Sequence, residues 1–438
     1  MDGYEMILRN SALSQSVSLY SITTDKFKTG NIYFSVMLPY DKTTSPYDAL
    51  LADVLRRSTS KYPTRASFAK RLDELYSASV GFRSVPHGKN SLFSVFAEIL
   101  DDRYVSDGLD VTDCICETLS DMLFSPLLAP DGDFTEEALT QEKRRNLKIL
   151  TSIKNNPRKY ASNRLTDIMR RDDPEHLNTD QLIEIISAAD RHSLSEFYRQ
   201  NIVTRQINVF YIGTLTHEQI AQKVMRHLGS HKATLNSAFT PLVPPYPERD
   251  MISVDEDMPI NQGRLEIGLR SDVIHGDPDA YALDLACAIL GGSPSSKLFM
   301  NVREKMSLCY SCASYYSPIT GTVSISSGIN PKNREIAQNA ILKEFHALQA
   351  GEISERELNC AKKDIENSYR EVYDDPLGLI SYYLKRVPFG ITRTLEEERN
   401  CFSALTLDDV VRAANRIKLD SIYFLNGTEC EGEEEEDD

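Results

Sequence analysis

The chain has 438 residues, of which 41% are hydrophobic and 26% charged; it is long enough for two or more buried domains and has an ordinary globular composition. Its formal net charge of -16 argues against nucleic-acid binding, because phosphate recognition requires a basic surface. No run of about 18 apolar residues occurs and the start, "MDGYEMILRN", lacks the layout of a signal peptide, so we expect a cytoplasmic protein without a membrane span.

The first half begins with alternating apolar and polar residues, "VSLYSITTDKFKTGNIYFSVML" at 17–38, which predict strands. Helical patterns follow, among them "FTEEALTQEK" at 134–143. Thr135 is its expected N-cap because acidic residues fill the turn that comes next, and Pro157 lies 22 residues beyond that cap.

The same layout returns in the second half. "ISERELNCAK" at 353–362 has Ser354 as its expected N-cap, and Pro376 again lies 22 residues beyond the cap. Two further pairs of segments match at offsets between about 215 and 235 residues: 45–59 with 277–293, and 186–214 with 402–428. The chain is therefore predicted to be a tandem duplication.

Five prolines between 239 and 263 remove backbone donors and predict an extended linker between the copies. Strands followed by runs of helices favour the α+β class, so we predict two homologous tandem halves, each a mainly antiparallel sheet covered by helices on one face. The predicted segments are an N-terminal domain at 1–235, a linker at 236–262, a C-terminal domain at 263–428 and an acidic tail at 429–438.

One stretch of the second half combines two reactive side chains. In "LGGSPSSKLFMNVREKMSLCYSCASYYSP" at 290–318, Arg303 lies on the flank of an apolar helical stripe, and Tyr310 follows where the pattern turns extended. A guanidinium and a phenol so placed can donate to one developing oxyanion. Taken alone, an ion pair at Arg303 and a tyrosine packed at a sheet edge explain the residues equally well.

Eight cysteines include the close pairs Cys114 with Cys116 and Cys309 with Cys312. A cytoplasmic chain normally keeps its cysteines reduced. A single Cys-x-x-Cys without a second pair is weak evidence for zinc, so we interpret Cys309 and Cys312 as packing residues.

The segment 290–318 resembles the second-half motif of the pitrilysin/insulinase family of zinc peptidases, which includes the mitochondrial processing peptidases. The resemblance covers nearly the whole chain, including the two α+β halves and the helix "EEALTQEKRRNLKILTSIKNNP" at 136–157. Within that family the chain looks closest to paired cytoplasmic insulinase-like proteins of Gram-positive bacteria. The resemblance implies that Arg303 and Tyr310 contact the scissile region of a peptide substrate.

The family binds zinc in its first half through His-x-x-Glu-His and a further Glu on a later helix, where the first Glu activates a zinc-bound water. Matching this motif to the present chain places it on 49–53, where Ala49, Ala52 and Asp53 stand in place of His, Glu and His, and the later Glu falls near Ile149. We therefore predict no metal and no cofactor in this chain.

The resemblance implies a role without autonomous catalysis. We predict a non-catalytic subunit that supplies Arg303 and Tyr310 to a heterodimeric zinc metallopeptidase, with the zinc in a homologous partner subunit and a peptide as substrate in a closed chamber. Whether the chain is an enzyme is left open, because activity requires that partner. We also expect an edge strand at 321–329 to receive the peptide by β-augmentation, although an ordinary interior strand fits equally well. Its predicted substrate-binding residues are Gly321, Thr322, Val323, Ser324 and Ile325.

Two alternatives remain from the sequence. A metal-free homologue can serve as a peptide-binding or scaffolding protein, which has no need of Arg303 and Tyr310 in one cavity. An autonomous zinc enzyme with an unrecognised site is the third interpretation, which stoichiometric zinc in the purified chain would support. No pattern identifies the substrate or the partner.

Overall fold

The computed structural model describes residues 6–235, 240 and 250–428. The predicted acidic tail at 429–438 and most of the proline-rich part of the predicted linker lie outside these residues. The chain divides into two compact units, and neither is one continuous segment. The first unit takes the chain up to Leu150, the segment that starts at Thr179, and Val372–Thr394; the second takes Thr151–Asn178, the segment that ends at Glu371, and the chain from Leu395.

The first unit contains a six-stranded sheet in the order β1-β2-β6-β3-β5-β4. All neighbouring strands are antiparallel except β2 and β6, which run parallel. The central strand β3 is buried at nearly every residue, as expected for a strand that is covered on both faces. The strands are β1 (Leu8–Ala12), β2 (Val17–Thr23), β3 (Thr29–Pro39), β4 (Ser79–His87), β5 (Asn90–Leu100) and β6 (Ile207–Gly213).

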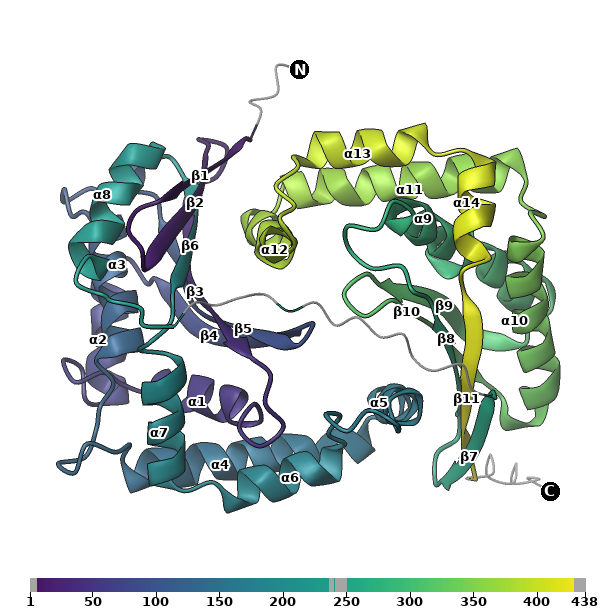
Figure 1. Ribbon diagram of the computed structural model, residues 1–438, viewed down its shortest axis with the longest axis horizontal. Coiled ribbons are helices and arrows are strands. Elements are labelled where there is room, and N and C mark those ends of the chain that lie inside the picture. The colour runs from purple at the N-terminus through teal and green to yellow at the C-terminus, as the bar shows by residue number, and fades with distance from the viewer. Residues whose placement is uncertain (1–5, 236–239, 241–249, 429–438) are drawn as a thin grey trace, which may run out of the picture. The chain divides into compact units, whose positions relative to one another are not determined.

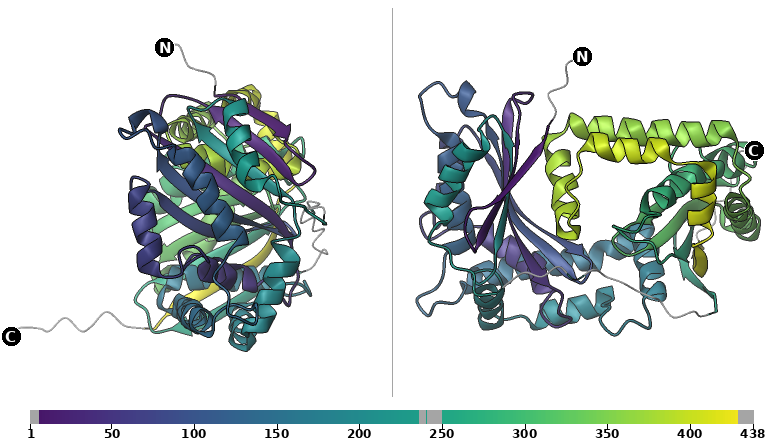
Figure 2. Two further views of the ribbon diagram at one scale, coloured as in Figure 1. Left: turned by 90° about the vertical axis from the view of Figure 1, so that its left-hand side faces the viewer. Right: turned by 45° about the horizontal axis from the view of Figure 1, so that its top comes forward.

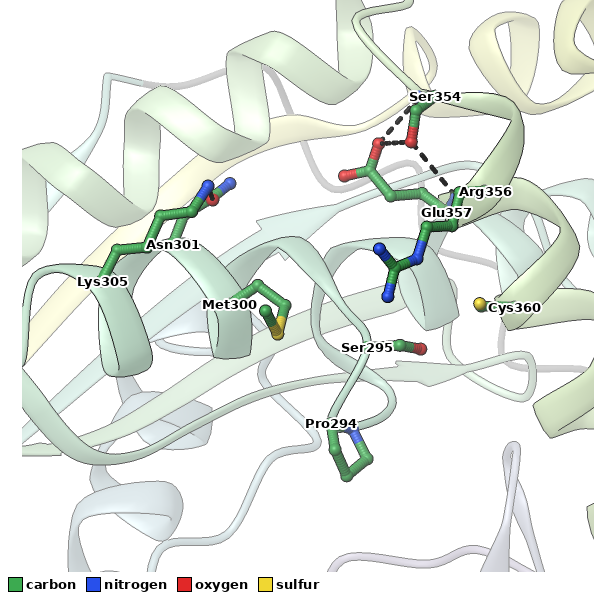
Figure 3. A pocket seen from close by; sticks show the side chains of 9 residues that line it. All are labelled: Pro294, Ser295, Met300, Asn301, Lys305, Ser354, Arg356, Glu357 and Cys360. Atoms are coloured by element: carbon green, nitrogen blue, oxygen red, sulfur yellow. Dashed lines mark hydrogen bonds between the residues drawn. The ribbon is translucent and has the colours of Figure 1, made fainter.

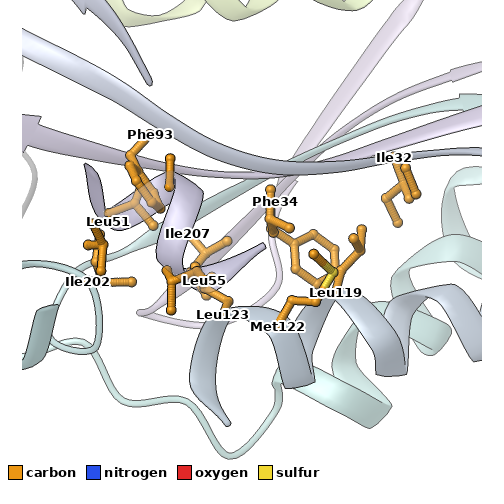
Figure 4. Packing of buried hydrophobic residues seen from close by; sticks show 14 of the residues in the cluster. Ile32, Phe34, Leu51, Leu55, Phe93, Leu119, Met122, Leu123, Ile202 and Ile207 are labelled. Carbon is orange, nitrogen blue, oxygen red and sulfur yellow. The ribbon is translucent and has the colours of Figure 1, made fainter. Parts of the chain in front are cut away.

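The hydrophobic core of this unit lies between the sheet and its helices. Ile32 and Phe34 of β3 pack with Leu119 and Leu123 of α3, and all four are at most 1% exposed (Figure 4). Burial of these side chains is the main stabilising contribution to the unit. The helices of the unit are α1 (Tyr47–Leu55), α2 (Arg65–Glu74), α3 (Val111–Phe124), α4 (Glu136–Thr151), α6 (Thr179–Ala188), α7 (Arg191–Asn201), α8 (His217–Leu228) and α12 (Pro376–Arg386).

The second unit contains a five-stranded sheet in the order β7-β11-β8-β10-β9. Helices α9 and α10 lie on one side of this sheet and α5 on the other (Figure 1). Its strands are β7 (Ile252–Met258), β8 (Gly263–Arg270), β9 (Cys309–Ser317), β10 (Thr322–Ile329) and β11 (Lys418–Gly427). Its helices are α5 (Pro157–Met169), α9 (Ala280–Gly291), a π-helix (Leu298–Lys305), α10 (Arg334–Gln349), α11 (Glu355–Tyr373), α13 (Leu395–Ala404) and α14 (Leu407–Ala414).

The strand orders confirm the predicted α+β class with two homologous halves. Five strands of the first sheet, β2-β6-β3-β5-β4, correspond in order to all five of the second, and in both sheets the first of these pairs is parallel. This correspondence corrects the predicted linker, because Ile252–Met258 forms β7, the counterpart of β2, and is not an unpaired extended segment. The predicted boundaries at 1–235 and 263–428 stay a prediction.

The predicted helix starts are also confirmed. The Thr135 hydroxyl accepts from the Ala138 amide at 3.3 Å, and the Ser354 hydroxyl accepts from the Glu357 amide at 3.2 Å, so they cap α4 and α11. Pro157 and Pro376 each occupy the first position of the next helix, α5 and α12, where a missing amide is tolerated.

Two helices complete the unit to which they do not belong in sequence. Helix α5 follows the first-half helix α4 but packs on β8 and β11 of the second unit, and Gly268 of β8 makes room for Met169. Helix α12 follows the second-half helix α11 but packs on β3 and β6 of the first unit (Figures 1 and 2). Each sheet therefore carries a helix on the face that the prediction left uncovered.

In the described part of the chain, none of the helices combines the length and the apolar character required to cross a bilayer.

Burial of Asp48 gives the first unit a pH-dependent stability. This carboxyl lies in the first turn of α1, is 5% exposed, and accepts from the Ser84 hydroxyl of β4 at 3.4 Å. Desolvation raises its pKa to about 7, against smaller opposing contributions from the Ser91 and Ser84 hydroxyls. The folded state consequently binds this proton more tightly than the unfolded state does.

Replacing Asp48 by Asn should raise the free energy of unfolding, relative to the unaltered protein, by more at pH 8 than at pH 4. Stability associated with the raised pKa is fully present below the unfolded value of 3.8 and is lost as pH rises through about 7. A neutral amide avoids that loss, which is on the order of 4 kcal/mol. Urea unfolding at both pH values measures the difference. The exposed Asp73→Asn is the matched control, and a pH-independent effect of Asp48→Asn would contradict the assignment.

Gly291→Ala should destabilise the second unit. A Cβ at this last residue of α9 would lie 2.6 Å from the backbone nitrogen of Ser314 and 2.9 Å from Leu298 Cδ1, so α9 would have to move from β9. Overpacking of this kind costs about 1–3 kcal/mol, whereas alanine in a helix ordinarily gains about 0.5–1 kcal/mol over glycine. Urea unfolding shows whether the cost of overpacking or the gain in helix propensity is larger. A more stable Gly291→Ala variant would show that the close contact relaxes without cost.

Candidate functional site

The positions that correspond to the zinc motif lie on α1, as the alignment requires. Ala49 is exposed, Ala52 is 8% exposed, and the Asp53 side chain is 21% exposed, while the neighbouring leucines of α1 enter the core. The spacing i, i+3 and i+4 places all three on one side of the helix. Only Asp53 supplies an atom that can bind a metal.

Asp53 is already occupied by basic and amide donors. Its carboxylate accepts from Arg56 at 3.1 Å, from Arg145 at 3.2 Å and from the Asn146 side-chain amide at 3.0 Å. Arg145 and Asn146 belong to α4, the helix that was predicted to resemble the family's glutamate-bearing helix. Ile149, one turn further along α4, is 48% exposed and offers no ligand atom.

A second carboxylate, Glu142, lies within the same group of side chains. It is 3% exposed, accepts from Arg57 at 2.7 Å and from Arg65 at 3.1 Å, and lies 3.6 Å from Arg145. We call the whole group the arginine–carboxylate network. Its members are Asp53, Arg56, Arg57, Arg65, Glu142, Arg145 and Asn146.

The arginine–carboxylate network does not fit a zinc ion. It brings four guanidinium groups to two carboxylates, so the local charge opposes a divalent cation, and it contains no imidazole or thiolate. No group of three or more His, Cys, Asp or Glu side chains suited to a metal occurs among residues 6–235, 240 and 250–428. The sequence showed that the zinc ligands are absent but did not reveal the arginine–carboxylate network. A search for basic residues that could pair with Asp53 would have suggested it.

The two predicted contact residues lie at one end of β9. Arg303 belongs to the π-helix, its guanidinium lies 4.5 Å from the centre of the Phe299 ring and its Nε lies 3.8 Å from Glu304. Tyr310 follows in β9 and is 64% exposed. Neither of these two contacts of Arg303 involves Tyr310. The structure therefore places both residues near the same end of β9, but these contacts do not connect their side chains.

A strained turn separates the π-helix from β9. Ser307 has a φ of 50°, in the left-handed region that residues other than glycine seldom adopt, and its amide donates to Arg303 O at 3.0 Å. Strained backbone and π-helical turns both concentrate at functional sites. This geometry is an independent reason to consider the end of β9 as a site.

The predicted edge strand is wrong. Strand β10, which contains 322–325, pairs with β8 on one side and β9 on the other, so its backbone groups are already used. Val323 and Ile325 are fully buried, and Gly321 is a turn residue with a φ of 66°. The edge strands of this sheet are β7 and β9, and β9 is the one beside β10. The β-forming residues correctly predicted a strand at this place, but such a pattern does not indicate which strands pair with it.

Strand β9 exposes a second tyrosine that the sequence interpretation did not single out. Tyr315 is 50% exposed, and its hydroxyl accepts from Arg158 of α5 at 3.2 Å. On β8, Glu266 is 1% exposed and accepts from the Ser326 hydroxyl at 2.7 Å, and burial raises its pKa to about 7. The sheet face around β9 is therefore polar. The aromatic run "SYYSP" at 314–318 was the signal in the sequence that could have identified Tyr315.

A pocket of about 550 Å³ lies between the π-helix and the start of α11 (Figure 3). The Arg356 side chain points into it, while Glu357 is held by Ser354 at 2.7 Å and by Lys297 at 2.9 Å. Arg303 and Tyr310 do not line the pocket. The lining residues are Pro294, Ser295, Met300, Asn301, Lys305, Ser354, Arg356, Glu357 and Cys360.

Comparison with known proteins agrees with this geometry. Residues 188–365 match the family described as "Peptidase M16 inactive domain". The chain is 29% identical over 413 residues to the "Probable inactive metalloprotease YmfF" of Bacillus subtilis, which covers 94% of this chain and 96% of that protein.

Solved structures share the fold over almost the whole chain. A conserved protein from Enterococcus faecalis aligns with a TM-score of 0.86 and 25% identity, covering 96% of this chain and 98% of that one. The structure described as a peptidase M16 inactive domain from Pseudomonas fluorescens aligns with a TM-score of 0.75 and 16% identity, covering 97% and 98%, and shows the fold alone. The predicted resemblance to the pitrilysin/insulinase family is confirmed, because the chain is similar over almost its whole length to the Bacillus subtilis metalloprotease homologue and part of it matches the M16 family model.

Proposed function

We propose that this chain is the non-catalytic, Arg303- and Tyr310-bearing subunit of a heterodimeric peptidase whose zinc lies in a homologous partner, acting on peptides in the cytoplasm. The observation that supports it most is a contrast between the two units. In the first unit, arginines bind Asp53, which alone among the zinc positions has a metal-binding atom, while Tyr310 stays 64% exposed at the end of an edge strand in the second.

The end of β9 can hold an extended peptide in two ways. The outer edge of a terminal strand offers backbone donors and acceptors to a peptide that adds as a further strand. The Tyr310 phenol and the Arg303 guanidinium can then donate to a peptide carbonyl, and more strongly to the oxyanion that develops during attack. The attacking water and its metal would come from the partner, which surrounds the peptide together with this chain.

A metal-free peptide-binding or scaffolding protein is the second candidate function. It is favoured by the stacking of Arg303 on Phe299 at 4.5 Å, a contact that by itself gives Arg303 a structural role. The pocket beside α11 would then be a further place for a partner to contact. The two functions differ in whether Arg303 and Tyr310 are needed for turnover.

The deciding experiment begins by purifying the chain from its native cell and asking whether the accompanying protein contains His-x-x-Glu-His. Mass spectrometry of the complex identifies that protein, and metal analysis locates the zinc. A partner without this motif would favour the scaffolding function.

In the reconstituted pair, Arg303→Ala and Tyr310→Phe should each lower kcat by on the order of 10²–10³, the usual effect of removing one oxyanion donor. Assembly and zinc content of the partner should stay unchanged, as measured by gel filtration and metal analysis. Tyr315→Phe is the matched control, because it removes an exposed hydroxyl from the same strand at a position bonded to Arg158. Unchanged peptide turnover in both Arg303→Ala and Tyr310→Phe would refute the proposed role.

Restoring the motif residues alone should not create a zinc enzyme. The triple variant Ala49→His, Ala52→Glu and Asp53→His leaves Arg145 beside the new imidazoles and removes the nearer of the two carboxylates that now balance it. We expect less than one zinc per chain after dialysis, measured by atomic emission, and no peptidase activity. Adding Arg145→Ala and Ile149→Glu removes the opposing charge and supplies the missing carboxylate, so this second variant should bind zinc more tightly. Equimolar zinc in the triple variant would show that the arginine–carboxylate network is no barrier.

A further inference from the structure

Two thiols lie directly beside Tyr310. Cys309 and Cys312 are unpaired cysteines with 9% and 6% of their surfaces exposed. The sequence interpretation treated them as packing residues, and the proposed peptidase role uses neither. Their arrangement in β9 gives them a chemistry of their own.

A β-bulge turns both thiols to the same face of the sheet. Residues three apart on a regular strand point to opposite faces. Here Cys309 pairs with Ile329 and Cys312 pairs with Ser327, so the three-residue step on β9 spans only two residues of β10, and Tyr310 is the extra residue. Two residues of strand extend about 6.7 Å, which lies within the Cα separation of about 4.4–6.8 Å found in disulfides.

The surroundings favour the thiolate on Cys309. A hydrogen bond with the Cys312 thiol lowers the pKa of Cys309 to about 7, burial opposes this shift, and the Ser327 hydroxyl and the charge of Arg303 add smaller lowering contributions. The same hydrogen bond and burial raise the pKa of Cys312 far above its ordinary value. Near neutral pH a large share of Cys309 is therefore the nucleophilic thiolate, which accepts a hydrogen bond from the Cys312 thiol.

We propose that Cys309 and Cys312 are a redox-active pair that closes to an intramolecular disulfide when the protein meets a hydroperoxide. The Cys309 thiolate attacks the peroxide, the O–O bond breaks, and a sulfenic acid forms with release of water or an alcohol after proton uptake. The Cys312 sulfur then attacks the Cys309 sulfur, the S–O bond breaks, and a second water leaves with the Cys312 proton. The peroxide is reduced by two electrons and the two thiols are oxidised by two.

The disulfide would enclose Tyr310 and Ser311 in a short covalent ring. The bulge that now aims Tyr310 would be fixed, and the thiolate beside Arg303 would be lost. An effect on peptide turnover follows only if the proposed function holds, whereas formation of the disulfide does not depend on it.

The test is oxidation of the folded, full-length chain with equimolar hydrogen peroxide, followed by alkylation, digestion and mass spectrometry. The peptide that follows Lys305 contains both cysteines and should lose two hydrogen atoms and escape alkylation. Cys360 and Cys401 are partly exposed single thiols and serve as internal controls that should remain reduced and alkylated. Oxidation of Cys360 ahead of the pair, or full alkylation at Cys309 and Cys312, would overturn the proposal.

Single variants separate the two roles. Cys312→Ser should stop the reaction at a Cys309 sulfenic acid that dimedone traps. Cys309→Ser should leave Cys312 unreactive to peroxide, because burial still disfavours its thiolate after the hydrogen bond with Cys309 is removed. In urea the preference for the pair over Cys360 should fall at least tenfold, because the bulge is lost. Equal reactivity of the two single variants would refute the assignment of Cys309 as the nucleophile. Unchanged turnover in Arg303→Ala together with normal disulfide formation in the unaltered chain would refute the proposed function alone. Lowered turnover in Arg303→Ala with no disulfide in the unaltered chain would refute the redox pair alone.

Discussion

The buried carboxylate of Glu142 is the constraint on which the first unit's chemistry depends. A carboxylate with 3% exposure is stable only when paired, and Arg57 and Arg65 provide the pairing from outside α4. Removing one partner of such a pair typically costs about 3–5 kcal/mol. Arg145 links the two carboxylates, because it lies 3.2 Å from Asp53 and 3.6 Å from Glu142. The positive charge that Glu142 attracts therefore extends to Asp53 and opposes a divalent cation at the zinc positions.

The duplication supplies two similar frameworks that differ in their side chains. In both units a helix ends in a turn with a left-handed residue, Ser77 before β4 and Ser307 before β9, and an edge strand follows. Aligning these two serines places Asp73 opposite Arg303 and Val80 opposite Tyr310. The arginine and tyrosine that we propose as donors to a peptide carbonyl thus have no counterparts at these two positions of the first unit. The backbone geometry that aims them is common to both and did not require a new fold.

Local signals in the sequence predicted what local chemistry determines. The caps at Thr135 and Ser354 and the prolines at 157 and 376 gave the helix starts correctly, because capping and proline act within a few residues. The sequence also revealed that Ala49, Ala52 and Ile149 lack ligand atoms.

Features that depend on distant segments could not be predicted in this way. The edge position of β9 depends on which strands find β10, and β7 pairs with β11 more than 150 residues later. The arginine–carboxylate network joins α1 to α4 across about 90 residues. No spacing rule connects such segments, since only the completed sheet brings them together.

The crossing of α5 and α12 has a consequence for how the chain is made. The first sheet contains residues from the start of the chain, yet the helix on its second face, α12, is translated only when synthesis reaches Pro376–Arg386. Until then the face of β3 and β6 that α12 covers remains open to the solvent and to other nascent chains. Most of the polypeptide must therefore leave the ribosome before α12 can cover the first sheet.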